Sequence, residues 1–344
     1  MANPRNEDVV GDLIQHGGNL AKARVLFPQA PEPWIDLSTG INPHSYPHSP
    51  IPGNVFARLP EPALLDELKV IAASAYHAPS AAHVAAGPGT QILLPIVASL
   101  IEGRKAAILS PTYAEHARAA KLAGFTVIET DDLKKLGTAD LAVIVNPNNP
   151  TGRIVAKDDL LSLAVIMRDK GGLLIVDEAF IDVSEAESVV DMVNDGGLLV
   201  LRSFGKFYGM AGLRLGFAIS RPDVVRTVEA RLGPWAVSGP ALHVASEALA
   251  DHSWQMKMQQ RLKDDAAKLQ NLLCGAGITV FGGTSLFRLV RHPRAQALYR
   301  HLGDHGIITR RFDERPDDLR IGLPGEDGWA RLEEALASFG AAQL

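Results

Sequence analysis

Residues 201–216 read LRSFGKFYGMAGLRLG. The stretch follows an apolar run at 198–201, which predicts a buried strand, and it places Ser203, Lys206 and Arg214 in a glycine-rich loop. A lysine amine can form a Schiff base with an aldehyde, and a neighbouring serine and arginine can hold a phosphate. A lone lysine is usually an exposed surface residue, but this spacing after a strand favours a chemical role for Lys206.

The sequence around this stretch alternates between short β-branched runs and segments with helical spacing. Helical spacing is found at 91–102, 115–123 and 157–170. The runs with strand character lie at 83–86, 106–109, 126–129, 141–145, 173–176, 198–201 and 216–219. This alternation predicts an α/β fold around a mainly parallel sheet, and from the runs alone we expect four to six of them to be strands.

Two of these runs end in polar residues. Asp177 follows the run 173–176, and the turn NPNNPTG at 146–152 follows the run 141–145. Sites of α/β sheets lie at the carboxyl ends of strands, so both positions are candidates for function. The alternatives are a helix cap for Asp177 and an ordinary Asn-Pro turn for the segment that contains Asn149.

Two further loops follow predicted strands. The segment 86–91 reads AGPGTQ and leads into a helix, so its backbone amides and the Thr90 hydroxyl form a candidate anion site. Tyr113 lies just beyond the next run, where its ring can stack on a planar ligand. A simple turn for the first loop and core packing for Tyr113 are the alternatives.

Composition limits the class of protein. The chain has 344 residues and a formal net charge of −5, which gives no reason to expect nucleic acid or an anionic membrane as a partner. Its single cysteine, Cys274, supports neither an internal disulfide nor a cysteine-based metal site, and no metal is expected. Glu7 and Asp8 stand where a signal peptide would be basic and apolar, so we expect a cytoplasmic protein.

Taken in order, these motifs resemble the fold-type I pyridoxal-phosphate (PLP) enzymes, which have the aspartate-aminotransferase fold with a seven-stranded sheet. The resemblance implies that Lys206 carries PLP as a Schiff base and that Asp177 keeps the ring nitrogen protonated, so that the ring accepts electrons. It also implies cofactor contacts for the other matching residues: Asn149 at the phenolate oxygen, Tyr113 against the ring, Gln91 nearby, and Gly89, Thr90, Ser203 and Arg214 around the phosphate.

Within these enzymes the chain is most similar to histidinol-phosphate aminotransferases and threonine-phosphate decarboxylases. Four segments favour the decarboxylases: HGGN at 16–19, STGINP at 38–43, LRSFGKFY at 201–208 and PWAVS at 234–238. The implied reaction converts L-threonine O-3-phosphate to (R)-1-aminopropan-2-yl phosphate for cobalamin synthesis. Arg320 would bind the substrate carboxylate, and Arg310, with Asn42 and His16, its phosphate; the neighbouring Arg311 is an alternative to Arg310.

Two other functions stay open at this stage. A rotated substrate would give transamination, which makes a histidinol-phosphate aminotransferase the main alternative. A PLP-binding protein without turnover is the other alternative, and retention of the cofactor residues argues against it.

The resemblance also implies a homodimer and a division of the chain. We expect an N-terminal segment at 1–45, a large PLP-binding domain at 46–240 and a small α+β domain at 241–344. In the last of these, the sequence pattern itself predicts a long helical stretch at 241–273 and weak strands at 279–281 and 286–290. One departure affects the dimer, because the family often has a tyrosine that reaches the partner's cofactor phosphate where this chain has Leu59. A leucine side chain cannot donate that hydrogen bond.

Overall fold

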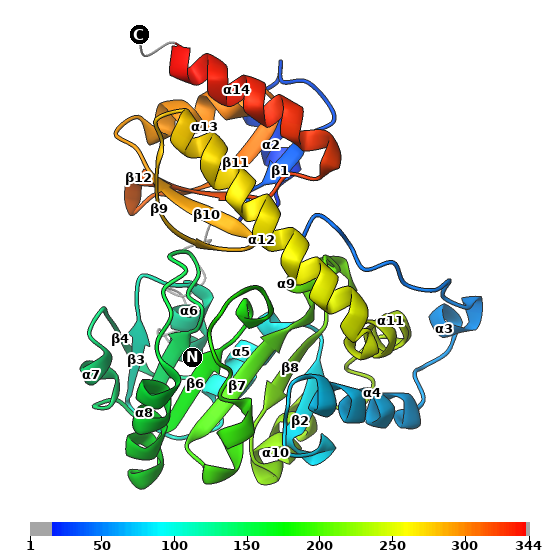
Figure 1. Cartoon of the computed structure of the whole chain (residues 1–344). Helices are drawn as coiled ribbons and strands as arrows, with labels where there is room; N and C mark the ends of the chain where they lie inside the picture. Colours follow the sequence, from blue (N-terminus) through cyan, green and yellow to red (C-terminus); the bar gives the residue numbers. More distant parts are fainter. Residues whose placement is uncertain (1–15, 342–344) are drawn as a thin grey trace, which may run out of the picture. The chain divides into compact units, whose positions relative to one another are not determined.

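The computed structural model describes residues 16–341, which form two compact units (Figure 1). The first unit contains residues 46–149 and 154–254, and the second contains residues 16–45, 150–153 and 255–341. Glu7 and Asp8 of the predicted N-terminal segment lie outside the described residues. The domain boundaries expected from the sequence, at 45 and 240, stay a prediction.

The first unit is built on a seven-stranded sheet in the order β2-β8-β7-β6-β5-β3-β4. All seven predicted runs form strands, more than the four to six expected from the runs alone, and the predicted sheet is confirmed. Strand β8 is antiparallel to both β7 and β2, and the remaining neighbours pair in parallel. The strands are β2 (Val84–Gly87), β3 (Lys105–Leu109), β4 (Thr126–Thr130), β5 (Leu141–Val145), β6 (Leu173–Asp177), β7 (Leu198–Ser203) and β8 (Gly216–Ile219).

Alternate strand residues face a core shared with three helices. Ile108, Val143 and Ile175 belong to one buried cluster with residues of α5, α6 and α10. Successive strand residues point to opposite faces, so the residues between them form the other face of the sheet. The helices of this unit are α3 (Gly53–Ala57), α4 (Pro62–Ala75), α5 (Thr90–Ala98), α6 (Glu115–Leu122), α7 (Leu133–Leu136), α8 (Lys157–Asp169), α9 (Phe204–Phe207), α10 (Pro222–Leu232) and α11 (Gly239–Ala250).

The second unit contains a five-stranded sheet in the order β1-β11-β12-β10-β9. Strands β9 (Thr279–Thr284) and β10 (Phe287–Arg291) agree with weak strands expected near 279–281 and 286–290. The sequence pattern missed β1 (Ile35–Leu37), β11 (Ile307–Phe312) and β12 (Arg315–Gly322). Strand β1 pairs in parallel with β11, so the first part of the chain contributes a strand that we did not expect.

Helices of the second unit are α2 (Leu20–Leu26), α13 (Ala295–Asp304), α14 (Trp329–Ala341) and most of α12 (His252–Gly275). The long helical stretch expected at 241–273 is two helices, because the chain leaves α11 at Asp251 and the Asp251 carboxylate accepts a hydrogen bond from the Trp254 amide at 2.9 Å. Across residues 16–341, no helix combines the length and apolar composition that crossing a membrane requires.

Candidate active site

Most of the predicted cofactor residues of the first unit lie at one edge of its sheet. The carboxyl ends of β3, β5, β6 and β7 meet at this edge because these strands are parallel, and β2 ends there as well. Strand β8 runs in the opposite direction and begins at the same edge. The loops that follow β2, β3, β5, β6 and β7 therefore lie at one edge of the sheet, together with the loop that precedes β8.

The loop after β2 and the loop before β8 form a close-packed cradle. Gly89 has φ 85°, and a Cβ atom there would lie 2.7 Å from the Arg214 Nη2 atom. A Cβ atom on Gly216 would lie 2.7 Å from the backbone nitrogen of Thr90, the first residue of α5. Ser203 pairs with Gly216 across β7 and β8. The cradle thus brings together the N-terminus of α5, Ser203 with its hydroxyl and the Arg214 guanidinium. This set of groups fits a phosphate.

Asp177 is buried at the end of β6, with 5% of its surface exposed. One of its carboxylate oxygens lies 2.8 Å from Nε2 of His116, and the other accepts a hydrogen bond from the Ala179 amide at 3.1 Å. His116 is buried on α6, and sequence reasoning missed it. The available signal was its position three residues after Tyr113, about one helical turn away. A fixed carboxylate of this kind fits a protonated ring nitrogen.

The Tyr113 side chain is held by a polar contact with Gln91 of α5, the helix that follows the cradle. Its hydroxyl donates to Oε1 of Gln91 at 2.9 Å, and the Gln91 amide donates to Glu115 at 2.6 Å. The Tyr113 and His116 rings meet edge to face, with centroids 6.1 Å apart. Gln91 therefore orients Tyr113, and the phenol ring lies beside the partner of Asp177.

The loop after β5 is tied to the loop after β3. The hydroxyl of Thr112 donates to the Asn148 side chain at 2.6 Å, and the Asn148 amide donates to the Pro111 carbonyl at 2.8 Å. The backbone N–H of Asn146 donates to the Asp177 carbonyl at 2.9 Å. Asn149, which is half-buried, directly follows this bonded segment, so its position relative to Tyr113 and Asp177 is restricted.

Lys206 lies on the short helix α9, directly after β7. The side chain is half-buried, and its Nζ atom lies 6.0 Å from the ring centroid of Phe180, which is buried. Phe180 follows Asp177 by three residues. The Lys206 amine therefore lies near the end of β6, the neighbour of β7 in the sheet.

In the second unit, Arg310 and Arg320 stand directly opposite each other across β11 and β12. Their side chains project from the same face of the sheet. The Arg311 side chain projects from the other face, and its Nη2 atom lies 3.6 Å from the Asp313 carboxylate. Arg320 is buried, and its Nη2 atom donates to the Ser38 carbonyl at 2.7 Å. Like charges directly opposite repel, so an anion between these two arginines would be favourable.

The early segment of the chain is anchored beside Arg320 in the same unit. The Gly18 amide donates to the Ser38 hydroxyl at 2.7 Å, and that hydroxyl donates to Asp36 at 2.5 Å. His16 is exposed and precedes this anchored pair, while Asn42 is buried and accepts from the His44 amide at 2.8 Å. The predicted substrate residues therefore fall in the second unit and the predicted cofactor residues in the first.

Comparisons with known proteins agree with this arrangement. Residues 34–338 match the family model of aminotransferases of class I and II. The threonine-phosphate decarboxylase of Sinorhizobium sp. is 43% identical over 329 residues, covering 94% of this chain and 98% of that protein. The threonine-phosphate decarboxylase of Pseudomonas aeruginosa is 40% identical over 331 residues, covering 95% and 98%.

A solved structure gives the same fold. The histidinol-phosphate aminotransferase of Sinorhizobium meliloti in complex with pyridoxal-5′-phosphate has a TM-score of 0.83 to this chain at 19% identity, covering 100% of this chain and 99% of that one. The predicted fold class is confirmed.

Proposed function

The chain belongs to the class I and II aminotransferase family, among the threonine-phosphate decarboxylases, and from that premise we propose that it decarboxylates L-threonine O-3-phosphate with PLP. The product is (R)-1-aminopropan-2-yl phosphate. The facing pair Arg310 and Arg320 carries the proposal, because this substrate has two anionic groups to be held. The identity to two decarboxylases over nearly the whole chain supports it.

The residues at the edge of the first sheet fit the cofactor. Lys206 would hold it covalently, and the Asp177 carboxylate would face its ring nitrogen. The other contacts would come from Asn149 at the phenolate oxygen, Tyr113 on the ring face with Gln91 behind it, and Gly89, Thr90, Ser203 and Arg214 around the phosphate. When bound, PLP supplies an electron sink for the bond that breaks at Cα.

The chain's own residues decide which bond breaks. Arg320 would bind the substrate carboxylate and so fix which bond at Cα is set for cleavage. Arg310, with Asn42 and His16, would hold the phosphate and prevent rotation of the substrate. The electrons of the C–C bond stay with Cα as carbon dioxide leaves. The Lys206 amine then donates a proton to Cα.

Transamination is the alternative function, and likeness to a histidinol-phosphate aminotransferase keeps it open. It requires loss of the Cα proton rather than of the carboxylate. The test is to incubate the PLP-loaded protein with L-threonine O-3-phosphate and to measure carbon dioxide and keto product separately. Carbon dioxide without keto product supports the decarboxylase, and keto product alone overturns it.

The two arginines are expected to differ in their effect on substrate choice. Losing one charged hydrogen bond costs about 1.5–3 kcal/mol, so Arg310→Ala should lower kcat/KM for threonine phosphate roughly ten- to a hundredfold. Threonine itself should be a poor substrate and lose little, because it lacks the phosphate. Arg320→Ala should weaken both substrates, since both have a carboxylate. Steady-state kinetics with the two compounds measures this difference.

Arg311→Ala is the matched control, because Arg311 lies on the opposite face of β11. It should leave the preference for the phosphate ester unchanged. An Arg310→Ala variant with an undiminished preference would count against the phosphate assignment, and a lost preference in Arg311→Ala would transfer the role to that residue.

A homodimer is also part of the proposal, together with a place in the cytoplasm and in cobalamin synthesis. The first unit exposes large apolar side chains at Phe56, Leu59 and Trp235, which are 67%, 65% and 57% exposed. Contiguous exposed apolar patches mark protein interfaces, and we propose these three side chains as part of one. Sedimentation should therefore give a dimer at working concentrations, and a fully active monomer would refute this part of the proposal.

A further inference from the structure

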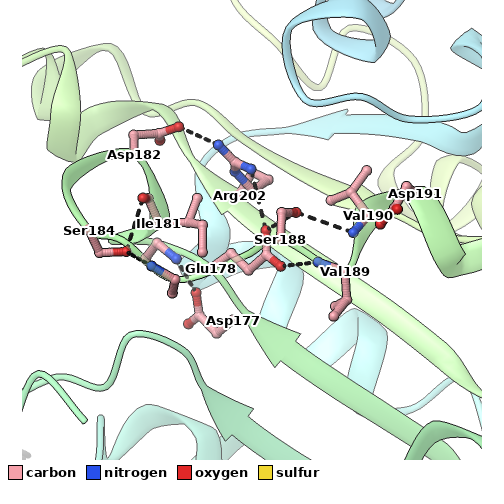
Figure 2. A network of polar contacts seen from close by, with 12 residues as sticks. Asp177, Glu178, Ile181, Asp182, Ser184, Ser188, Val189, Val190, Asp191 and Arg202 are labelled. Atoms are coloured by element: carbon pink, nitrogen blue, oxygen red, sulfur yellow. Dashed lines mark hydrogen bonds and ion pairs between the residues drawn. The ribbon is translucent and has the colours of Figure 1, made fainter. Parts of the chain in front are cut away.

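An ionic network of Arg202, Glu178 and Asp182 lies next to Asp177, at the ends of β6 and β7 (Figure 2). Arg202 is 4% exposed and Glu178 is fully buried, and their Nη1 and Oε2 atoms are 3.3 Å apart. A second guanidinium nitrogen of Arg202 donates to the Asp182 carboxylate. Arg202 and Glu178 are the immediate sequence neighbours of Ser203 and Asp177, which face the cofactor in the proposed function.

Further contacts hold Glu178 and Arg202 in this network. Glu178 accepts hydrogen bonds from the Ser188 hydroxyl at 2.7 Å and from the Val189 amide at 2.9 Å. The Arg202 guanidinium lies 4.2 Å from the ring centroid of Tyr76, a buried residue at the end of α4. Burial raises the pKa of the Glu178 carboxyl, and the charge of Arg202 opposes that rise. Each charge therefore depends on its partners to stay ionised in the interior.

The network and the site occupy opposite faces of the same two strands. The Glu178 amide donates to the Leu201 carbonyl at 2.9 Å, which continues the pairing of Asp177 with Leu201. Side chains alternate along a strand, so Asp177 and Ser203 point to one face, and Glu178 and Arg202 to the other. The contact of Asp177 with α6 and of Arg202 with the end of α4 agrees with this division.

We infer that Arg202, Glu178 and Asp182 are positioning residues that lock the carboxyl ends of β6 and β7 together. The lock fixes the distance between Asp177 and Ser203, and with it the start of the helix that carries Lys206. Hydrophobic packing gives comparable or better stability than a buried ion pair, so stability alone does not require three charges here. Directional bonds between two strand ends instead give a fixed register at the place where cofactor groups must meet.

The inference rests on the proposed function only through its PLP site, so cofactor binding is the quantity to measure. Arg202→Met alone would leave the Glu178 and Asp182 carboxylates without their cation and is expected to destabilise the fold strongly. The test variant therefore combines Arg202→Met, Glu178→Gln and Asp182→Asn, which removes every charge and keeps hydrogen-bonding groups for Ser188 and Val189.

We expect this triple variant to melt near the wild-type temperature without PLP, yet to bind PLP about ten- to a hundredfold more weakly, because small displacements are costly at such sites. The pH titration of the absorbance of the bound cofactor should shift as well, which a purely structural role would not cause. Wild-type PLP affinity together with an unchanged titration would overturn the inference. A wild-type protein that binds PLP without releasing carbon dioxide would overturn only the proposed reaction.

Two further variants complete the experiment. Lys69→Met with Glu229→Gln removes another ion pair of the first unit, at 2.5 Å, and should leave PLP affinity unchanged. Arg202→Lys keeps the charge but loses the planar fork that reaches two carboxylates, so it should fold and bind PLP more weakly than the wild type. If the triple variant does not fold, Arg202→Lys decides, and unchanged affinity in that variant overturns the inference.

Discussion

Lys206→Ala is expected to give a folded protein that holds no PLP covalently and has almost no decarboxylase activity. Lys206 is the amine that directly follows β7, next to the end of β6, and the proposal gives it both the covalent link and the proton donated to Cα. Loss of a positioned proton donor alone lowers turnover about 10²- to 10⁴-fold. Borohydride reduction followed by peptide mapping should place the pyridoxyl group on Lys206 in the wild-type protein and nowhere in the variant.

Lys157→Ala is a suitable control for this variant. Lys157 pairs with Asp191 at 2.9 Å on the surface of the first unit, so its removal should change neither labelling nor turnover. Recovery of the label on another lysine of the wild-type protein would mean that the site is assigned to the wrong residue.

Asp177→Asn is expected to keep PLP bound but to lower kcat on the order of a hundredfold, as removal of one electrostatic contact at a reacting centre does. Asparagine has nearly the same shape and can accept the Ala179 hydrogen bond, so the loop should stay in place. The carboxylate charge that would keep the ring nitrogen protonated is lost. Absorbance of the bound cofactor and kcat, measured on one preparation, separate binding from turnover.

Asp191→Asn provides the matched control, because Asp191 is half-exposed and lies in the ion pair with Lys157. It should behave as the wild type in both measurements. Near-normal kcat in Asp177→Asn, or loss of PLP from it, would each disagree with the role given to this carboxylate.

The first unit was predicted well because its strands, apart from the edge strand β4, are buried on both faces. Such strands are continuous apolar runs in sequence, and turn residues follow directly at the functional edge. The second sheet was harder to predict. Strand β1 has only three residues, and β11 and β12 contain Arg310, Arg311 and Arg320, so no apolar run marks them. Pairing in space, rather than composition, makes these segments strands.

The same reasoning explains which site residues were found. Asp177 and Lys206 follow strands directly, so their position was readable from the chain order. His116 was not, since its contact with Asp177 depends on how α6 packs on the sheet. Arg202 lies in the stretch 201–216 and Glu178 directly follows Asp177, yet the pairing of these two residues depends on the register of β6 and β7. The choice between Arg310 and Arg311 likewise depends on which face of β11 each one occupies.

The antiparallel pairing of β8 with β7 has a consequence for how this chain tolerates insertions and deletions. The segment 204–215 is flanked by Ser203 and Gly216, which pair with each other across β7 and β8. Surface loops usually accept added residues at small cost. Both ends of this loop are fixed. A residue inserted between Lys206 and Arg214 would therefore displace one of these two side chains from its place at the candidate site. Its length should therefore be as restricted as the identity of its lysine.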